Sequence, residues 1–424
     1  MPGGGAGAGQ EMPAAPDALL AATPRAVPDR SLSPEAVERV CRSALRALWA
    51  RLRPSSAFPE LPGDLTLRED GLGLDSLELL EAVADANARF ALHETGTEDH
   101  LLIFPTLTQW AAAITRHIAH EGPQARFRFA TSGSTDAPRQ VEHSLRALDA
   151  EVTALRADLW TGGGAPDRPG RIVALVPCHH IFGFLFTALL PDRAGLPVVD
   201  LSGAGPGAMS RVLRTGDALV ATPFLLDLAL RAGTKAPEGC QAIVSGAPMP
   251  VALWRAAQAA GLAVTEVYGA TETGGIGIRR AGDAPFGLLS HLKRDDASVR
   301  ACGPDAPARA LPVQDRLEWH GPRQFRLAGR RDAVVQIGGV NVSPEAVARH
   351  LRAAPEVADA AVRLDARTGR LKAFIVPQDA GADRATLTAR LDAHADDLDG
   401  PARPRRYDFG DALPRGETGK LADW

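Results

Sequence analysis

The chain has 424 residues, of which 45% are hydrophobic and 23% are charged, and its formal net charge is -4. These values are typical of a globular protein with two or three domains, and the slight acidity excludes a basic surface for nucleic acid or anionic membranes. No apolar run reaches the ~20 residues that cross a bilayer, so we expect neither a nucleic-acid nor a membrane partner.

Residues 1–30 are rich in Gly, Ala and Pro without a repeating period, which predicts a disordered tail. They lack the basic and apolar regions of a secretory signal peptide. The four cysteines include no CxxC pair and are typical of reduced thiols, so we expect a cytoplasmic protein.

Helical periodicity dominates residues 31–121. Apolar residues recur every three or four positions in three stretches, and each stretch begins with a residue type that caps helices. The pattern predicts a small all-α domain. Its expected helices begin at Ser33 and Pro34, at Asp75 or Ser76, and at Thr106, the last running to about His120.

After residue 121 the pattern changes to short apolar runs that end at Gly, Pro or Ser. Strands alternating with helices predict an α/β domain, residues 122–328, whose sheet is at least partly parallel. Strands such as 171–177 are apolar on both faces, so the sheet needs layers on both sides. Residues 329–424 show a smaller α+β pattern. The expected strands are 126–132, 171–177, 218–223, 240–246 and 263–269, and the expected helices are 144–159, 249–260 and 344–353.

The stretch LGLDSLELLE, residues 72–81, places Ser76 at a helix start. A serine or an aspartate at this position is most simply an N-cap. The stretch also resembles acyl carrier proteins, in which the serine of a DSL motif carries 4'-phosphopantetheine. The resemblance implies a four-helix carrier bundle, a phosphopantetheinyl transferase that modifies Ser76, and a downstream carrier-dependent synthase as partner. A decayed carrier fold is the alternative.

Four further motifs follow one another along the chain. TSGSTDAPR (131–139) can form a nest of N–H groups for phosphates, although small residues also make plain turns, and it lacks the GK[ST] of a Walker loop. The others are VYGATETGG (267–275), GRRDAVVQIGGVNVSPEAV (329–347) and LPRGETGKL (413–421). Together they resemble the adenylate-forming superfamily of acyl-CoA synthetases and adenylation domains. The resemblance implies a large α/β domain, a small mobile C-terminal domain, ATP and Mg²⁺.

The resemblance gives a role to each matching position. Glu272 would ligate Mg²⁺, Thr271 would hydrogen-bond the α-phosphate, and Tyr268 would stack on the adenine. Asp332 would form the hinge between the domains, and Lys420 would neutralise charge as the carboxylate attacks the α-phosphate. The other ATP-binding positions are Thr131, Ser132, Gly133, Ser134 and Thr135 in the phosphate loop, Ser245, Gly246 and Ala247 near the adenine, Gly269, and Asp315 and Arg330 at the ribose.

His180, in VPCHHIFG, matches the histidine that lines the acyl pocket and is counted with the catalytic residues. A zinc site at residues 178–180 is disfavoured, because adjacent side chains diverge. Among the expected pocket segments the acids are Asp227 and Glu272, so an acid to grip an α-amino group is not evident. We therefore expect an aryl or short acyl acid, such as a starter unit for polyketide or pigment assembly. The expected pocket segments are 178–186, 223–228 and 270–276.

The two resemblances together imply an enzyme that activates a small carboxylic acid as acyl-AMP and transfers it to the phosphopantetheine thiol on Ser76. An acyl-CoA ligase that uses free coenzyme A is one alternative, and a non-catalytic carrier and docking protein with a decayed ligase half is another. Asp136 and Arg139 stand where the family usually has Gly and Lys. The family's long segment before the phosphate loop has no counterpart here, so we expect a homodimer to cover the exposed apolar surface.

Replacement of the closing-motif lysine, Lys420→Ala, should abolish acyl-AMP formation. Loss of a cation aimed at developing charge costs ~10²–10³ in rate or more. ATP–pyrophosphate exchange with the best acid measures the step. Exchange that stays near the wild-type rate would show that LPRGETGKL does not close the active site.

Overall fold

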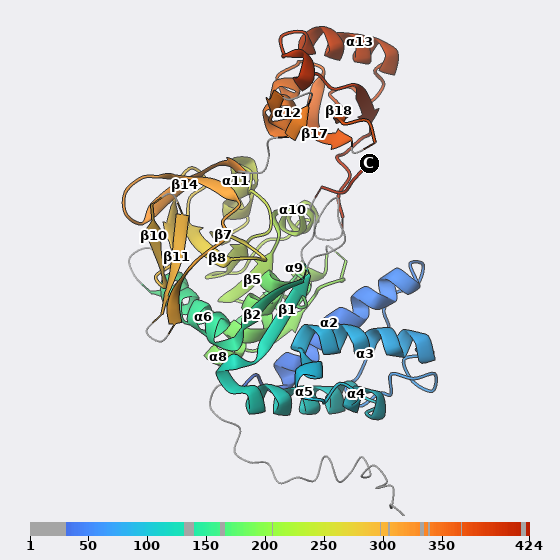
Figure 1. Cartoon of the computed structure of the whole chain (residues 1–424), viewed down its shortest axis with the longest axis vertical. Coiled ribbons are helices and arrows are strands. Elements are labelled where there is room, and N and C mark those ends of the chain that lie inside the picture. Colours follow the sequence, from blue (N-terminus) through green and yellow to red (C-terminus); the bar gives the residue numbers. More distant parts are fainter. Residues whose placement is uncertain are drawn as a thin grey trace, which may run out of the picture. The chain divides into compact units, whose positions relative to one another are not determined.

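The computed structural model describes most of the chain after residue 30 (Figure 1). The chain forms two compact units, of which one runs to Arg128 and includes Glu142–Ala147, and the other holds the remaining residues. No helix in the described part is long and apolar enough to span a membrane. The described residues are 31–130, 140–161, 166–205, 207–296, 298–303, 306–330, 335–337, 340–365, 367–416 and 421–424.

The first unit is helical, as the periodicity predicts (Figure 1). α2 packs against α3 and α5, and its apolar stripe is buried. Trp110 of α5 is also buried, and its Nε1 donates to the backbone oxygens of Leu101 and Phe104 at 2.9 and 3.0 Å. These bonds satisfy the indole N–H away from water. The elements are α2 Pro34–Leu52, α3 Ser76–Phe90, α4 His100–Ile103 and α5 Leu107–Glu121, with 3₁₀ turns at Leu92–Glu94 and Gly122–Gln124.

The first turn of α3 is capped by Asp75. One carboxylate oxygen of Asp75, Oδ1, accepts from the backbone N–H groups of Leu77 and Glu78 at 2.8 and 2.9 Å. In return the Glu78 carboxylate accepts from the Asp75 N–H at 3.0 Å, which completes a capping box. Ser76 is therefore the first helical residue and not the cap, and its side chain is exposed.

A nine-stranded sheet forms the core of the second unit. The strands β7, β6, β5, β3 and β4 pair in parallel, which confirms the α/β prediction, and the strands from β7 to β13 pair antiparallel. The sequence patterns did not predict this antiparallel half. In spatial order the strands are β13 Asp315–Trp319, β14 Gln324–Arg330, β9 Phe286–Leu288, β8 Gly274–Arg279, β7 Ala263–Ala270, β6 Gln241–Val244, β5 Asp217–Ala221, β3 Arg171–Ala174 and β4 Val198–Asp200.

Both faces of the central parallel strands β3, β5 and β6 are buried. Val173, Leu219 and Val244 share one core with residues of α9, α10 and α11. Side chains alternate between the faces of a strand, so their fully buried neighbours Ile172 and Val220 point to the other face. The π-helical segment Leu185–Leu189 also contacts β3. The helices are α6 Leu145–Trp160, α7 Ile181–Phe184, α8 Leu190–Ala194, α9 Ala208–Val212, α10 Pro223–Arg231 and α11 Val251–Ala259.

The C-terminal segment has the predicted α+β character (Figure 1). It also has its own hydrophobic core. β17 pairs antiparallel with β18, which pairs in parallel with β19, while β15 and β16 form a separate hairpin. A three-stranded sheet, β10 to β12, was not predicted. The bounds are β10 Leu292–Asp295, β11 Ser298–Gly303, β12 Ala306–Ala310, β15 Val335–Ile337, β16 Val340–Val342, α12 Pro344–Arg352, β17 Val357–Asp365, β18 Arg370–Pro377, α13 Arg384–Ala395, a 3₁₀ turn at Gly400–Ala402 and β19 Arg406–Phe409; the paired strands β1 Arg126–Ala130 and β2 Gln140–Ser144 come earlier.

The capping geometry of α3 gives a testable difference between two neighbouring residues. Asp75→Ala should lower the stability of the first turn of α3 by about 1 kcal/mol, because two backbone N–H groups lose their acceptor. Ser76→Ala should change it by a few tenths at most. Amide hydrogen exchange at Leu77 and Glu78 measures the local effect. Equal protection in the two variants would show that Asp75 is not the cap.

Candidate active site

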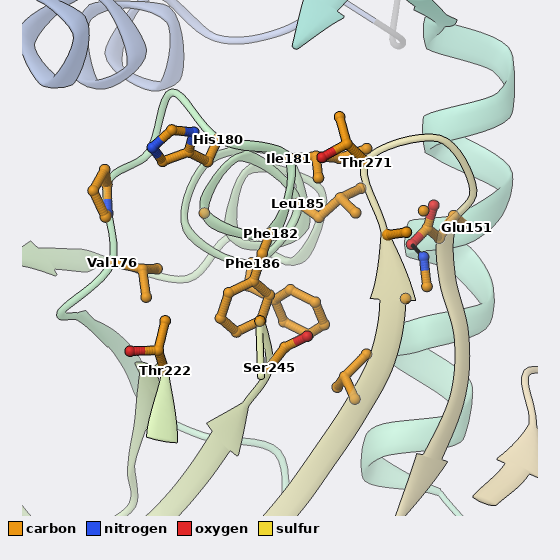
Figure 2. Close-up of a pocket in the computed structure, with 18 of the residues that line it drawn as sticks. Glu151, Val176, His180, Ile181, Phe182, Leu185, Phe186, Thr222, Ser245 and Thr271 are labelled. Atoms are coloured by element: carbon orange, nitrogen blue, oxygen red, sulfur yellow. Dashed lines mark hydrogen bonds between the residues drawn. The ribbon is translucent and has the colours of Figure 1, made fainter. Parts of the chain in front are cut away.

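A cavity of about 120 Å³ lies at the carboxyl ends of the parallel strands. Val176 follows β3, Thr222 follows β5, Ser245 follows β6, and Gly269 is near the end of β7. Loops at this edge of a parallel sheet are the usual ligand sites of α/β folds. Figure 2 shows most of the lining residues, which are Ala130, Glu151, Val176, Pro177, His180, Ile181, Phe182, Gly183, Leu185, Phe186, Thr222, Leu225, Ser245, Gly246, Val267, Gly269, Ala270, Thr271, Gly274 and Gly275.

The largest apolar wall of the cavity comes from α7 and the π-helical segment. Phe182 and Phe186 project into the centre of Figure 2, with ring centroids 5.1 Å apart. π-Helical turns occur frequently at functional sites, because the wider turn redirects side chains. A Cβ atom at Gly183 would lie 2.0 Å from the carbonyl oxygen of Pro177, so only glycine lets this wall approach the loop after β3. His180, the N-cap residue of α7, lines the cavity.

Three residues predicted to bind the nucleoside lie together at the antiparallel half of the sheet. The Tyr268 hydroxyl donates to Oδ2 of Asp315 at 2.5 Å. Asp315 is in turn the register partner of Arg330 in the β13–β14 pair. The Tyr268 ring packs at 5.8 Å from both Phe286 and Phe325. These contacts fix the orientation of the Tyr268 ring.

Thr271 and Glu272 occupy the turn between β7 and β8. Thr271 lines the cavity (Figure 2), and Glu272 is half-buried beside it. Within the described ranges no cluster of three metal-ligating side chains exists. Mg²⁺ in nucleotide sites uses one or two carboxylates together with phosphate oxygens. The single Glu272 carboxylate therefore fits the expected ligand set.

The remaining predicted positions divide into three groups. Ser245 and Gly246 line the cavity, and Ala247 follows them as a half-buried residue. Ser76 belongs to the other unit. The residues Thr131, Ser132, Gly133, Ser134, Thr135, Asp332 and Lys420 lie outside the described part of the chain, as does the side chain of Arg330.

The expectation for acids in the pocket was wrong in one respect. Leu225 of α10 lines the cavity, but Asp227 does not, and its carboxylate pairs with Arg231 one helical turn later at 2.7 Å. The acid in the cavity is Glu151 of α6, which the sequence analysis missed. Leu148, Val152 and Leu155 form the buried stripe of this helix. A glutamate within that stripe was the available signal.

Glu151 is 5% exposed and sits in the fold of the β7–β8 turn. Its Oε1 accepts from the backbone N–H of Gly275 at 2.6 Å. Burial raises the pKa of this carboxyl group from 4.5 to about 8, and the Gly275 bond offsets the effect only in part. At neutral pH the Glu151 side chain is therefore mainly a neutral acid, with one O–H donor.

The turn is shaped around this carboxyl group. A Cβ atom at Gly274 would lie 2.1 Å from Oε2 of Glu151, and one at Gly275 would lie 2.9 Å from Oε1. Gly274 also has a φ of +68°, which side chains rarely adopt. The Gly274–Gly275 pair therefore makes room for Glu151.

Comparison with known protein families and proteins gives consistent results. The family model described as "AMP-binding enzyme" matches residues 125–318. The chain is 44% identical to 4-coumarate–CoA ligase of Rhodobacter capsulatus and 40% identical to that of Cereibacter sphaeroides, over 92% and 96% of this chain and 100% of each relative.

Two solved structures share the fold. ATP-bound MatB from Rhodopseudomonas palustris has a TM-score of 0.59 at 19% identity, covering 90% of this chain and 91% of that chain. O-succinylbenzoate CoA synthetase of Bacillus subtilis, solved with ATP and magnesium, has a TM-score of 0.51 at 19% identity, covering 69% and 68%. This similarity supports an adenylate-forming fold with a large α/β domain and a small C-terminal domain.

Burial of Glu151 makes folding stability depend on pH. The carboxyl group keeps its proton up to about pH 8 in the folded chain but loses it near pH 4.5 when unfolded. The free energy of unfolding should therefore fall as pH rises through this window, by about 1.4 kcal/mol per pH unit. Glu151→Gln has no such proton, so its melting temperature should fall less over the same window.

The matched control is Asp149→Asn, on the same helix, whose wild-type carboxylate pairs with Arg193 at 2.8 Å instead of entering the cavity. In this variant the melting temperature should fall with pH as it does in the wild type, because Glu151 is unchanged. If the melting temperatures of wild type and Glu151→Gln fall equally between pH 4.5 and 8, the raised pKa is contradicted.

Proposed function

The chain belongs to the adenylate-forming acyl-CoA ligase family, and on this premise we propose that it joins an aryl acid of the 4-coumarate type to coenzyme A. The observation that carries this proposal is the cavity itself. It is walled by Phe182, Leu185 and Phe186, and its rim carries Thr271 of the YGATE motif. A flat aromatic acid fits such walls, with its carboxylate directed to the nucleotide residues.

The proposed reaction has two half-reactions. A carboxylate oxygen of the acid attacks the α-phosphorus of ATP, so that acyl-AMP forms and pyrophosphate leaves. The thiolate of coenzyme A then attacks the acyl carbonyl carbon, the thioester bond forms and AMP leaves. The chain's contribution is to orient and to neutralise charge. Thr271 would contact the α-phosphate, Glu272 would hold Mg²⁺, and Lys420 would stabilise the charge that develops on the α-phosphate.

The nucleoside would be held by the Tyr268–Asp315 pair. With its hydroxyl engaged by Asp315 at 2.5 Å, the Tyr268 ring has a fixed orientation against Phe325. A fixed ring loses little entropy when a base stacks on it. Magnesium, when bound, would screen the phosphate charges that oppose attack by the carboxylate.

Coenzyme A is the better-supported acceptor, in place of the tethered thiol on Ser76 that the sequence first suggested. The relatives named as 4-coumarate–CoA ligases align over 92% or more of this chain and over their whole length. An alignment of that extent includes most of the helical unit. A helical unit before the ligase domain is therefore compatible with transfer to free coenzyme A.

One observation favours a second candidate acceptor. The Ser76 hydroxyl is not used for capping, because Asp75 fills that role. Leu77 and Leu80 next to it are 77% and 48% exposed, unusual for large apolar side chains. An exposed serine beside exposed leucines is open to a transferase, so phosphopantetheine on Ser76 stays a second proposal.

The test compares wild type with Ser76→Ala. We expect both proteins to convert 4-coumarate, ATP and coenzyme A to the thioester at similar rates, as chromatography of the products measures. A thioester that depends on Ser76, with intact mass showing an attached phosphopantetheine, would support the carrier reading. No adenylate from any aryl acid, together with no ATP binding, would support a decayed ligase.

A further inference from the structure

Among the described residues that line the cavity, Glu151 is the only acid. The surrounding walls are mainly aliphatic and aromatic, with hydroxyl groups from Thr222, Ser245 and Thr271 (Figure 2). A nearly fully buried carboxyl group in such a site needs partners for both oxygens. We therefore expect the ligand of the cavity to supply a partner for the Glu151 carboxyl group.

The hydrogen bonding of Glu151 is incomplete. Oε1 accepts from the Gly275 N–H at 2.6 Å, and this is the hydrogen bond that the structure gives for this side chain within the described residues. A neutral carboxyl group has a further donor and further acceptor sites. The causes of its raised pKa include no charged neighbour. A neutral polar group on the ligand is the complementary partner.

We propose that Glu151 is the specificity-determining residue that hydrogen-bonds a hydroxyl group on the aromatic ring of the acid. The proposal rests on the proposed function and deepens it. The carboxyl O–H donates to the ring hydroxyl oxygen, and the ring hydroxyl can donate to a carboxyl oxygen in return. Both groups stay uncharged, so the pairing costs less desolvation than an ion pair would.

The glycine pair holds the carboxyl group in place for this contact. Glu151 is anchored through Gly275, and the room at Gly274 exists only because that residue has no Cβ, which would come within 2.1 Å of Oε2. A donor fixed in this way discriminates strongly, because an acid that lacks the hydroxyl leaves the buried carboxyl group unpaired.

A substrate pair that differs by one hydroxyl group tests the proposal. For the wild type, kcat/KM for 4-coumarate should exceed that for cinnamate by about 10²-fold or more, since sites built to hydrogen-bond a hydroxyl reject analogues that lack it. In Glu151→Leu this ratio should fall to a few-fold. Glu151→Gln can still hydrogen-bond and should give an intermediate ratio, and Asp149→Asn should keep the wild-type ratio.

The outcomes separate the inference from the proposed function. Thioester formation from cinnamate or 4-coumarate by the wild type tests the function alone. Suppose that the wild type forms thioester but both variants, Glu151→Gln and Glu151→Leu, keep the wild-type ratio of kcat/KM for the two acids, or lose activity equally on both acids. Then Glu151 does not recognise the ring hydroxyl, and the inference is overturned. Should Glu151→Leu not fold, Glu151→Gln decides, because a ratio that falls at least tenfold supports the hydrogen bond and an unchanged ratio overturns it. If the wild type activates neither acid, the proposed function fails and the inference falls with it.

Discussion

The parallel pairing of β3, β5, β6 and β7 is the constraint on which the site depends. Parallel strands end on the same side, so the loops after them meet at one edge. Residues separated by up to about a hundred positions thereby line one cavity, from Val176 to Ala270. Burial on both faces makes this arrangement rigid, because β5 and β6 have no exposed position along their length.

The antiparallel hairpin of β7 and β8 contributes the polar side chains of the site. The hairpin is tied at its base by Glu266, whose carboxylate pairs with Arg279 at 2.7 Å and accepts from the Met249 N–H at 3.2 Å. Its turn carries Thr271 and Glu272. The fixed base of the hairpin places the Thr271 and Glu272 side chains at the edge of the sheet. The glycines of the turn let it fold closely around Glu151.

Much of the fold follows from local periodicity. The helices of the first unit and the parallel strands β3, β5, β6 and β7 were predicted close to their observed bounds, because 3.6-residue stripes and short apolar runs are local signals. The parallel edge strand β4 was not predicted. The antiparallel strands were missed because stretches such as GGIGIR carry few strand-forming side chains. The resemblance gave Tyr268 and Asp315 their roles, but their contact joins positions 47 residues apart and needs the folded sheet. Glu151 was missed for the same reason, since its partner Gly275 is 124 residues away.

The two buried glutamates of this domain show what distinguishes a structural acid from an open one. Burial raises the pKa of both. Glu266 is compensated by Arg279, so its charge is paired and its oxygens are engaged within the chain. Glu151 has a single N–H donor among the described residues and faces a cavity. Uncompensated burial lowers stability, and folds retain such a cost chiefly at functional sites. The ligand is then the best source of the missing hydrogen-bond partner. When the ligand binds, it would complete the hydrogen bonding of Glu151, and this hydrogen bond would contribute to the free energy of binding.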